Sequence, residues 1–182
     1  RDLYVTGVQT CALPILEILL RNWRDVADDV REARTSEFSP LNLIRAIRHL
    51  IILARPEAQI NWPQQMPHNG CIEGDRTLIP ALANIVINAC DAAASEAVNV
   101  SMDADSALLR LTVTNPVSHN TAFPKELLGS RFIHSESGFG VGAVLSNATI
   151  EKYGGKVSWE KSGNQVTTVI ELPLAKGEDT VD

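Results

Sequence analysis

Long apolar runs and clustered cysteines are both missing from this sequence. No apolar stretch approaches the ~18 residues of a membrane-spanning helix, so any anchor of the full-length protein would lie outside these residues. The three cysteines, at positions 11, 71 and 90, are too far apart for a metal-binding motif or a disulfide framework. Such sparse cysteines suit a reducing cytosol. We therefore expect a cytoplasmic location for this part of the protein.

Basic clusters are missing as well. The chain carries 16 Lys and Arg against 22 Asp and Glu, which gives a formal net charge of −6. Nucleic acids and anionic membrane surfaces attract proteins through patches of positive charge. The composition therefore gives no support for either kind of partner.

The first fifteen residues differ in origin from the rest. Residues 5–15, VTGVQTCALPI, resemble the translation of a common sequencing adapter, and residues 1–4 fit its flank and index. We interpret residues 1–15 as an assembly artefact and exclude them from the fold prediction. A signal sequence is the alternative, but Pro14 and the missing basic-apolar-small order argue against it. Residues 16–182 are long enough for one domain of ~100 to 200 residues.

Two early segments have the pattern of amphipathic helices. Residues 16–34 place apolar side chains at a 3-4 spacing, as in a helix that packs along a seam with other helices. Ser39 as the cap and Pro40 at the first position predict a second helix that ends at Arg55. His49 lies inside this second helix, where we expect a structural role.

The second half of the chain alternates apolar and polar residues as strands do. Two hairpins and one short early strand are predicted, over residues 59–62, 98–103, 108–114, 156–160 and 166–172. A helix over residues 141–153, stopped by Gly154-Gly155, connects the hairpins, and residues 66–74 are predicted as a turn-rich loop. This order predicts an α/β two-layer sandwich with a mixed, mainly antiparallel sheet, preceded by one helix.

Residues 75–94 form the helix on which the functional prediction depends. Pro80 fits only the first turn, so the regular helix is predicted to start near Ile79. Asn84, Asn88 and Asp91 lie at i, i+4 and i+7, so three polar side chains line one edge of an apolar helix. One buried Asn usually only bonds to neighbouring loops. Three in register favour a ligand, since an amide oxygen suits Mg²⁺ and a carboxylate accepts from an exocyclic amine.

A glycine-rich motif follows the longest segment without a regular pattern, residues 115–137. A loop of more than ~15 residues inside a compact domain is usually a functional lid or disordered. It leads into Gly138, Gly140 and Gly142, where backbone N–H groups could approach phosphate oxygens at a helix N-terminus. A plain mobile loop is the alternative, and the glycines argue against it.

The two motifs together resemble sensor histidine kinases. Residues 84–92, NIVINACDA, are similar to the N box of that family, and residues 138–142 are similar to its second glycine box. The resemblance covers residues 39–173 and implies the Bergerat (GHKL) ATP-binding fold. It also implies the following domains: the end of a dimerisation and phosphotransfer helix at 16–35, the ATP-binding catalytic domain at 36–175 and a disordered tail at 176–182.

The resemblance also implies a site for ATP and Mg²⁺. Asn88 would bind the metal, Asn84 would support it, and Asp91 and Asn115 would line the nucleotide pocket. Phe132 resembles the phenylalanine of the family's F box in the lid. The complete set of implied cofactor-binding residues is Asn84, Asn88, Asp91, Asn115, Phe132, Gly138, Gly140, Val141 and Gly142.

The first glycine box departs from the family pattern. Where the commoner form has Asp-x-Gly-x-Gly, this chain has Asn115, Val117 and His119. An amide oxygen can still accept a hydrogen bond from the adenine amine, and some kinases of the quorum-sensing type carry a similar Asn-Pro. Whether ATP affinity is normal therefore stays open. Residues 145–155 also resemble redox-responsive kinases of the RegB type.

The implied activity is phosphoryl transfer by positioning and charge neutralisation. In the ATPase branches of this fold a Glu, four residues before the Mg²⁺-binding Asn, activates water. Asn84 holds that position here and is a poor base. We therefore expect transfer of the ATP γ-phosphate to a histidine of a dimerisation domain missing from this chain, which itself holds no catalytic residue. Implied partners are that domain, in a homodimer, and a response regulator, with any inner-membrane anchor in the missing part.

Two alternatives stay open at this point. Gly138, Gly140 and Ala143, with Glu160 about twenty residues on, resemble a dinucleotide-binding motif, but residues 131–137 do not have the pattern of the preceding strand. The second alternative is a degenerate, non-catalytic domain that acts through partner binding, motivated by the altered first glycine box.

Overall fold

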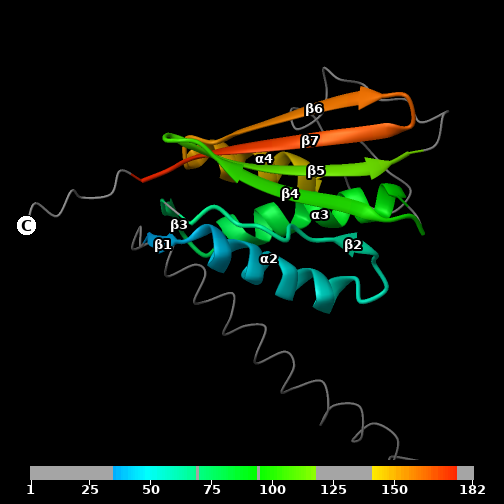
Figure 1. Cartoon of the computed structure of the whole chain (residues 1–182), viewed down its shortest axis with the longest axis horizontal. Helices are drawn as coiled ribbons and strands as arrows, with labels where there is room; N and C mark the ends of the chain where they lie inside the picture. Colours follow the sequence, from blue (N-terminus) through cyan, green and yellow to red (C-terminus); the bar gives the residue numbers. More distant parts are fainter. Residues whose placement is uncertain (1–34, 69, 94, 118–140, 176–182) are drawn as a thin grey trace, which may run out of the picture. The chain divides into compact units, whose positions relative to one another are not determined.

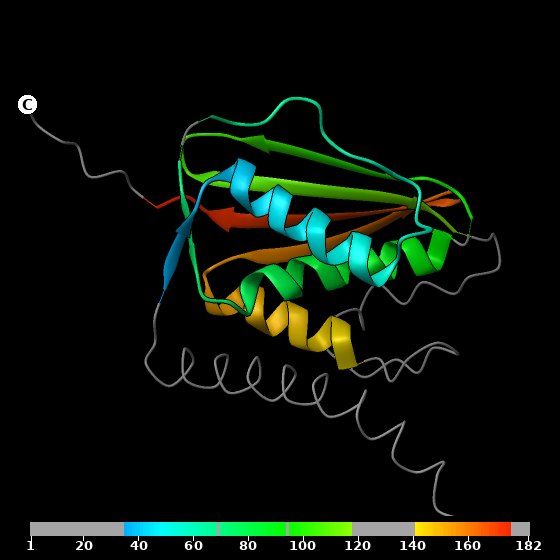
Figure 2. The same cartoon turned by 90° about the horizontal axis from the view of Figure 1, so that it is seen from below.

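The computed structural model describes residues 35–68, 70–93, 95–117 and 141–175. The chain divides between residues 35 and 36, and all elements below belong to the second unit. In this unit three helices cover one side of a five-stranded sheet, as Figures 1 and 2 show. The predicted two-layer α/β sandwich is therefore confirmed. The helix predicted over residues 16–34 lies outside the described residues.

The sheet has the order β2-β4-β5-β7-β6. Its strands are β2 (Ile60–Asn61), β4 (Val98–Ala104), β5 (Leu108–Pro116), β6 (Lys156–Ser162) and β7 (Gln165–Pro173). Among the described strands of this sheet only β2 and β4 run parallel, and both predicted hairpins are antiparallel. A sheet of this topology is not the doubly wound parallel sheet of a dinucleotide-binding domain. The fold thus contradicts that alternative.

Side chains along β4 and β5 alternate between the helix layer and the open side of the sheet. Val98, Val100 and Met102 of β4 are buried, whereas the residues between them are exposed. The same period of two runs along β5, from Leu109 to Asn115, so that Asn115 lies on the buried face. The alternation predicted from the sequence is what sets this register.

A second, two-stranded sheet joins β1 (Ser36–Phe38) to β3 (Ile72–Gly74) in antiparallel register. The prediction of residues 66–74 as a loop was therefore wrong for the last three of them. Each strand has only three residues, too few for a visible alternation, and the partner strand lies far away in sequence. Local pattern could not show this pairing, because its hydrogen bonds depend on the distant segment.

The three helices match the predicted segments closely. They are α2 (Pro40–Ala54), α3 (Leu78–Ala93) and α4 (Val141–Lys152). Ser39 caps α2, and its Oγ accepts a hydrogen bond from the backbone N–H of Asn42 at 3.3 Å. After α4, Gly154 adopts a φ of +71°, which favours glycine, and the N–H of Gly155 donates to the carbonyl of Ile150 at 3.0 Å.

Helix α3 is the centre of the core. It lies between α2 and α4 and packs against the sheet, which lies behind the three helices in Figure 2. Leu78, Leu82 and Val86 of α3 are completely buried, together with Leu43 and Ile47 of α2. Burying a side chain of this size contributes ~1.5 to 3 kcal/mol each. The helix that carries the polar stripe is thus also the helix most firmly held in the fold.

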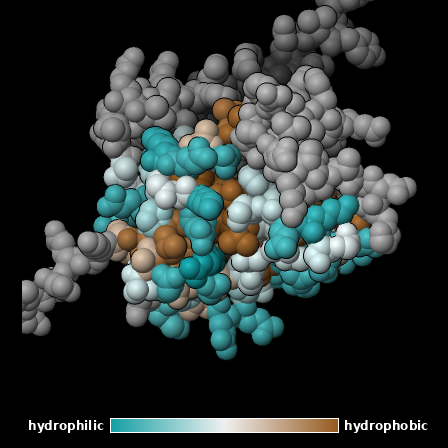
Figure 3. All heavy atoms as spheres, turned by 90° about the horizontal axis from the view of Figure 1, so that it is seen from above, coloured by the Kyte–Doolittle hydropathy of each residue, from teal (hydrophilic) through white to brown (hydrophobic). Residues whose placement is uncertain are grey.

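Strand β6 forms one edge of the sheet and is the uppermost strand in Figure 1. Lys156, Ser158 and Glu160 are exposed along it. Figure 3 looks down on the molecule from above and shows hydrophilic residues beside smaller hydrophobic areas. Charged side chains on an edge strand oppose pairing with other chains.

Among the described residues, no helix is long and apolar enough to cross a membrane.

Candidate functional site

The predicted polar stripe is present on α3. Asn84 is half-buried, and Asn88 and Asp91 are exposed one and two turns further along the helix. Their neighbours Ile85 and Val86 are buried in the core. Because α3 is fixed on its apolar faces, the three polar side chains project from a rigid support.

Asn84 of the polar stripe contacts the end of the glycine motif. Its amide Nδ2 donates to the hydroxyl of Ser146 on α4 at 3.0 Å. Gly142, in the first turn of α4, lies against the same amide, since a methyl group on Gly142 would come within 2.8 Å of Asn84 Nδ2. Two motifs that are far apart in the sequence are therefore in contact.

This contact gives a testable role to Gly142. We expect Gly142→Ala to displace the Asn84 amide and to weaken ATP binding by about tenfold, the cost of ~1.4 kcal/mol, although Ala favours the helix. Gly154→Ala is the control. Gly154 has a φ of +71° after the far end of α4, with only Pro173 Cγ in ordinary contact at 3.5 Å, so Ala should lower Tm without changing ATP affinity. Equal affinity in Gly142→Ala and wild type would contradict this role.

Asn115 is the residue predicted from the family resemblance to recognise adenine, and this role stays a prediction. It lies near the end of β5 on the buried face of the sheet and is only 3% exposed. Its Nδ2 donates to the carbonyl of Pro116 at 3.0 Å. The chain then continues to Val117, whose N–H donates to the carbonyl of Asn164 at 2.7 Å. The strand end that carries the amide is thus anchored to the β6–β7 turn.

Asp91 has a partner that the sequence did not reveal. Its carboxylate accepts from Arg55 Nε at 2.9 Å and from Arg55 Nη2 at 3.3 Å, a bidentate pair at the end of α2. The pair raises the pKa of the Arg55 guanidinium. Asp91 can therefore line a nucleotide pocket only together with Arg55, and the predicted role of Asp91 stays a prediction.

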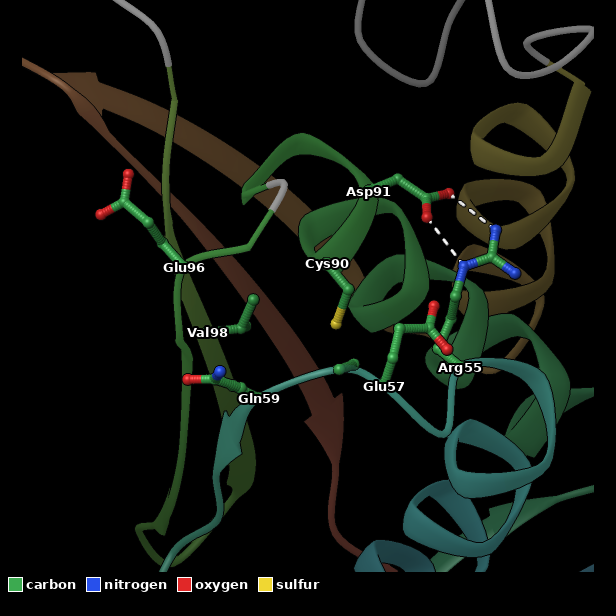
Figure 4. A pocket seen from close by; sticks show the side chains of 8 residues that line it. Arg55, Glu57, Gln59, Cys90, Asp91, Glu96 and Val98 are labelled. Carbon is green, nitrogen blue, oxygen red and sulfur yellow. Dashed lines mark hydrogen bonds and ion pairs between the residues drawn. The ribbon is translucent and has the colours of Figure 1, made fainter.

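The Arg55–Asp91 pair borders a pocket between the ends of α2 and α3 and the starts of β2 and β4 (Figure 4). Cys90 and Val98 form its buried part, and burial raises the pKa of the Cys90 thiol. A raised pKa leaves less of the thiolate form, which is the form of cysteine that acts as a nucleophile. The lining residues are Arg55, Glu57, Ala58, Gln59, Cys90, Asp91, Glu96 and Val98.

A second charged cluster joins the start of α3 to the end of α4. The buried Asp75 carboxylate accepts from the N–H of Thr77 at 2.7 Å and pairs with Lys152 Nζ at 2.8 Å. The backbone N–H of Asp75 donates to the Tyr153 hydroxyl at 3.1 Å. Burial raises the pKa of Asp75, but the bonds with Lys152, Thr77 and Tyr153 outweigh it and hold the pKa well below its usual range.

The two contacts between α3 and α4 lie at different places along the pair. Asp75 and Lys152 join the start of α3 to the end of α4, whereas Asn84 and Ser146 meet near the middle of both helices. The beginning of α4, where the glycine motif ends, is thereby placed relative to the polar stripe. Neither Ser146 nor the Asp75 cluster was predicted as part of the site.

Several predicted residues lie outside the described residues. These are Phe132, Gly138 and Gly140, together with His119 of the first glycine box. Val141 begins α4, and Gly142 is the part of the glycine motif whose surroundings the structure describes. In the described ranges, no group of three or more His, Cys, Asp or Glu is placed to hold a metal ion.

A family model matches residues 74–176, the model of the histidine kinase-, DNA gyrase B- and HSP90-like ATPases. This match covers more than half of the chain, so the chain belongs to that family. It begins at the Asp75 cluster and includes the whole polar stripe. A search of curated proteins found no match.

Solved structures share the fold. A mycobacterial sensor histidine kinase, MprB, is 17% identical with a TM-score of 0.63, over 78% of this chain and 97% of that chain. The nucleotide-free catalytic domain of histidine kinase ThkA is 24% identical with a TM-score of 0.62, over 77% and 97%. The histidine kinase AdeS of Acinetobacter baumannii is 14% identical with a TM-score of 0.59, over 97% and 87%. The chain is thus an ATP-binding domain with the fold of sensor histidine kinase catalytic domains.

Proposed function

We propose that this domain binds Mg-ATP and transfers the γ-phosphoryl group to a histidine on a separate dimerisation domain. The observation that supports this proposal most is the contact between Asn84 and Gly142. This contact brings the polar stripe of α3 beside the end of the glycine motif. A triphosphate with its cation needs polar metal ligands and backbone N–H groups close together. A histidine on a partner domain is the acceptor that the family resemblance implies.

The polar groups of α3 fit a magnesium nucleotide. Asn88 is exposed on the same edge of α3 as Asn84, and its amide oxygen is the hard donor that Mg²⁺ prefers. When bound, Mg²⁺ would neutralise charge on the phosphates. Asn84, held by Ser146, would support Asn88 from the preceding turn. Asn115 would accept from the adenine amine, and Gly142 would let the phosphates approach the start of α4.

The lack of a free carboxylate on the described polar stripe favours phosphoryl transfer over hydrolysis. A water-activating base is expected at position 84, and Asn84 has no carboxylate to serve as one. On the described part of the stripe the only carboxylate belongs to Asp91, and it is engaged by Arg55. A domain without a positioned base is suited to hand the phosphoryl group to an acceptor imidazole instead. A response regulator would be the next acceptor, in line with a solved structure of similar fold, that of histidine kinase ThkA in complex with the response regulator protein TrrA.

Calorimetry separates this proposal from a degenerate domain. We expect Mg-ATP to bind with a 1:1 stoichiometry and addition of EDTA to weaken the binding strongly, because Asn88 would hold the Mg²⁺ that neutralises the phosphates. NAD should not bind. Absence of any heat with Mg-ATP would contradict the proposal and favour a non-catalytic domain that acts through partner binding.

A further inference from the structure

The outer side of α2 carries a regular line of exposed side chains. Leu41, Arg45, Arg48 and Ile52 follow one another at spacings of four, three and four residues. This spacing puts them on one line along a helix, and we call these four residues the α2 stripe. All four are exposed, Leu41 by 41% and Ile52 by 53%. In Figure 2, α2 lies in front of the sheet, with its opposite side packed on the core.

The charge of the α2 stripe is opposite to that of the chain. Helix α2 contains no Asp or Glu, although the chain has a net charge of −6. Among the described residues neither Arg45 nor Arg48 has an acidic partner, whereas Arg55 and Arg110 each form ion pairs. The two guanidinium groups are therefore available to carboxylates of another molecule.

The apolar ends of the stripe are also exceptional for this domain. Four large hydrophobic side chains are exposed in the described part of the chain, and three of them, Leu41, Ile52 and Leu53, belong to α2. Single exposed hydrophobic residues need no explanation. Here Leu41 and Ile52 flank two uncompensated arginines on one line, at the spacing with which one helix packs along another, and Leu53 lies next to Ile52 in the chain.

We propose that the α2 stripe docks an acidic helix of a second protein. The complementary helix would carry two carboxylates between two apolar side chains at the same spacing. Eleven residues separate Leu41 from Ile52, or ~16 Å along the helix, so about three turns of the partner suffice. The carboxylates would pair with Arg45 and Arg48, and the apolar residues would cover Leu41, Ile52 and Leu53.

The α2 stripe is separate from the nucleotide-binding residues but ends close to them. Three residues after Ile52 comes Arg55, which pairs with Asp91 at the end of the polar stripe of α3 (Figure 4). The docked helix would therefore lie beside this ion pair without covering Asn84 or Asn88. Docking through the α2 stripe does not depend on the proposed phosphoryl transfer and can be tested apart from it.

Labelled helical peptides test this proposal on the full chain. The probe is an Ala-rich peptide of about 25 residues, long enough to be helical, with Leu, Glu, Glu and Leu at the 4-3-4 spacing. A second peptide carries Lys in place of both Glu residues. We expect fluorescence anisotropy to show binding of the Glu peptide, and at least a tenfold loss of affinity in the double variant Arg45→Glu, Arg48→Glu. That variant should bind the Lys peptide instead.

Controls keep the result decisive. Lys156→Glu changes an exposed cation on β6 and should leave Glu-peptide binding unchanged. If circular dichroism shows that the double variant is unfolded, the variant Arg45→Gln, Arg48→Gln is used in its place. Equal binding of the Glu peptide to wild type and variant overturns the proposal. Self-association that depends on Arg45 and Arg48 also overturns the proposal, because the occupant would then be a second copy of the chain. Binding to vesicles with anionic lipid that depends on the same arginines overturns it as well, because the occupant would then be a membrane.

Discussion

Replacing Asn88 with Ala should abolish most of the magnesium-dependent affinity for ATP. Loss of an outer-shell partner of a metal ligand typically costs 10–100-fold in affinity, so loss of the ligand itself should cost about 100-fold or more. The fold should survive, because Asn88 is exposed on α3 and Ala is the better helix former. Calorimetry with Mg-ATP measures the effect, and calorimetry with ATP and EDTA should show little difference between variant and wild type.

Asn42→Ala provides the matched control for this experiment. Asn42 is also an exposed asparagine on a helix, in the first turn of α2, where its backbone N–H donates to the Ser39 hydroxyl. Its replacement should leave Mg-ATP affinity unchanged. If Asn88→Ala binds Mg-ATP as wild type does, Asn88 does not belong to the metal site.

Replacing Asp75 with Ala should cause the largest loss of stability of any single charge change in the described domain. The carboxylate is 4% exposed, caps the start of α3 through Thr77 and pairs with Lys152. Breaking a fully buried pair costs ~3 to 5 kcal/mol, but Lys152 is 54% exposed and can be solvated, so about 2 kcal/mol is expected. Tm should fall by about 5 to 10 °C.

Asp105→Ala is the comparison variant. Asp105 also accepts from two backbone N–H groups and pairs with an arginine, Arg110, but its side chain is 46% exposed. Exposed ion pairs contribute ~0 to 1 kcal/mol, so its loss should be clearly smaller. A loss in Asp75→Ala no greater than that in Asp105→Ala would show that the buried cluster does not hold α3 and α4 together.

The same cluster predicts sensitivity to acid. Because the pKa of Asp75 is lowered on folding, its ionised form stabilises the folded state above the ordinary carboxyl pKa of about 4. This stabilisation is lost progressively as the pH falls below that value. The urea midpoint of wild type should therefore drop between about pH 4 and 2 more steeply than that of Asp75→Asn. If the urea midpoints of wild type and Asp75→Asn fall in parallel with pH, Asp75 is not the source of the acid sensitivity.

Sequence pattern predicted those parts of the fold that depend on local signals. Ser39 and Pro40 located the start of α2, and the period of two along β4 and β5 located the first hairpin. The pairing of β1 with β3 was missed, because it depends on hydrogen bonds between segments about 36 residues apart and not on either sequence alone. Residues at element boundaries shifted by one or two positions, as at Leu78 of α3.

The same division holds for the site. Helical spacing was enough to place Asn84, Asn88 and Asp91 on one face, because α3 is regular. It could not give their partners. Ser146 lies 62 residues from Asn84, and Arg55 lies 36 residues from Asp91, so only the tertiary fold brings these pairs together. The buried role of Asp75 depends likewise on Lys152, 77 residues away.

Phosphoryl transfer from γ-labelled ATP tests the proposed function most directly. The four histidines are His49, His68, His119 and His134, and the two described ones, His49 and His68, are exposed on α2 and in the loop before β3. None is predicted to be an acceptor in line with the γ-phosphate. The separately supplied dimerisation domain should therefore be labelled in trans, and slowly, since a preorganised acceptor gains up to ~7 to 11 kcal/mol. Acid-labile, base-stable label on that domain alone is the predicted result, whereas stoichiometric labelling of this chain by itself would contradict it.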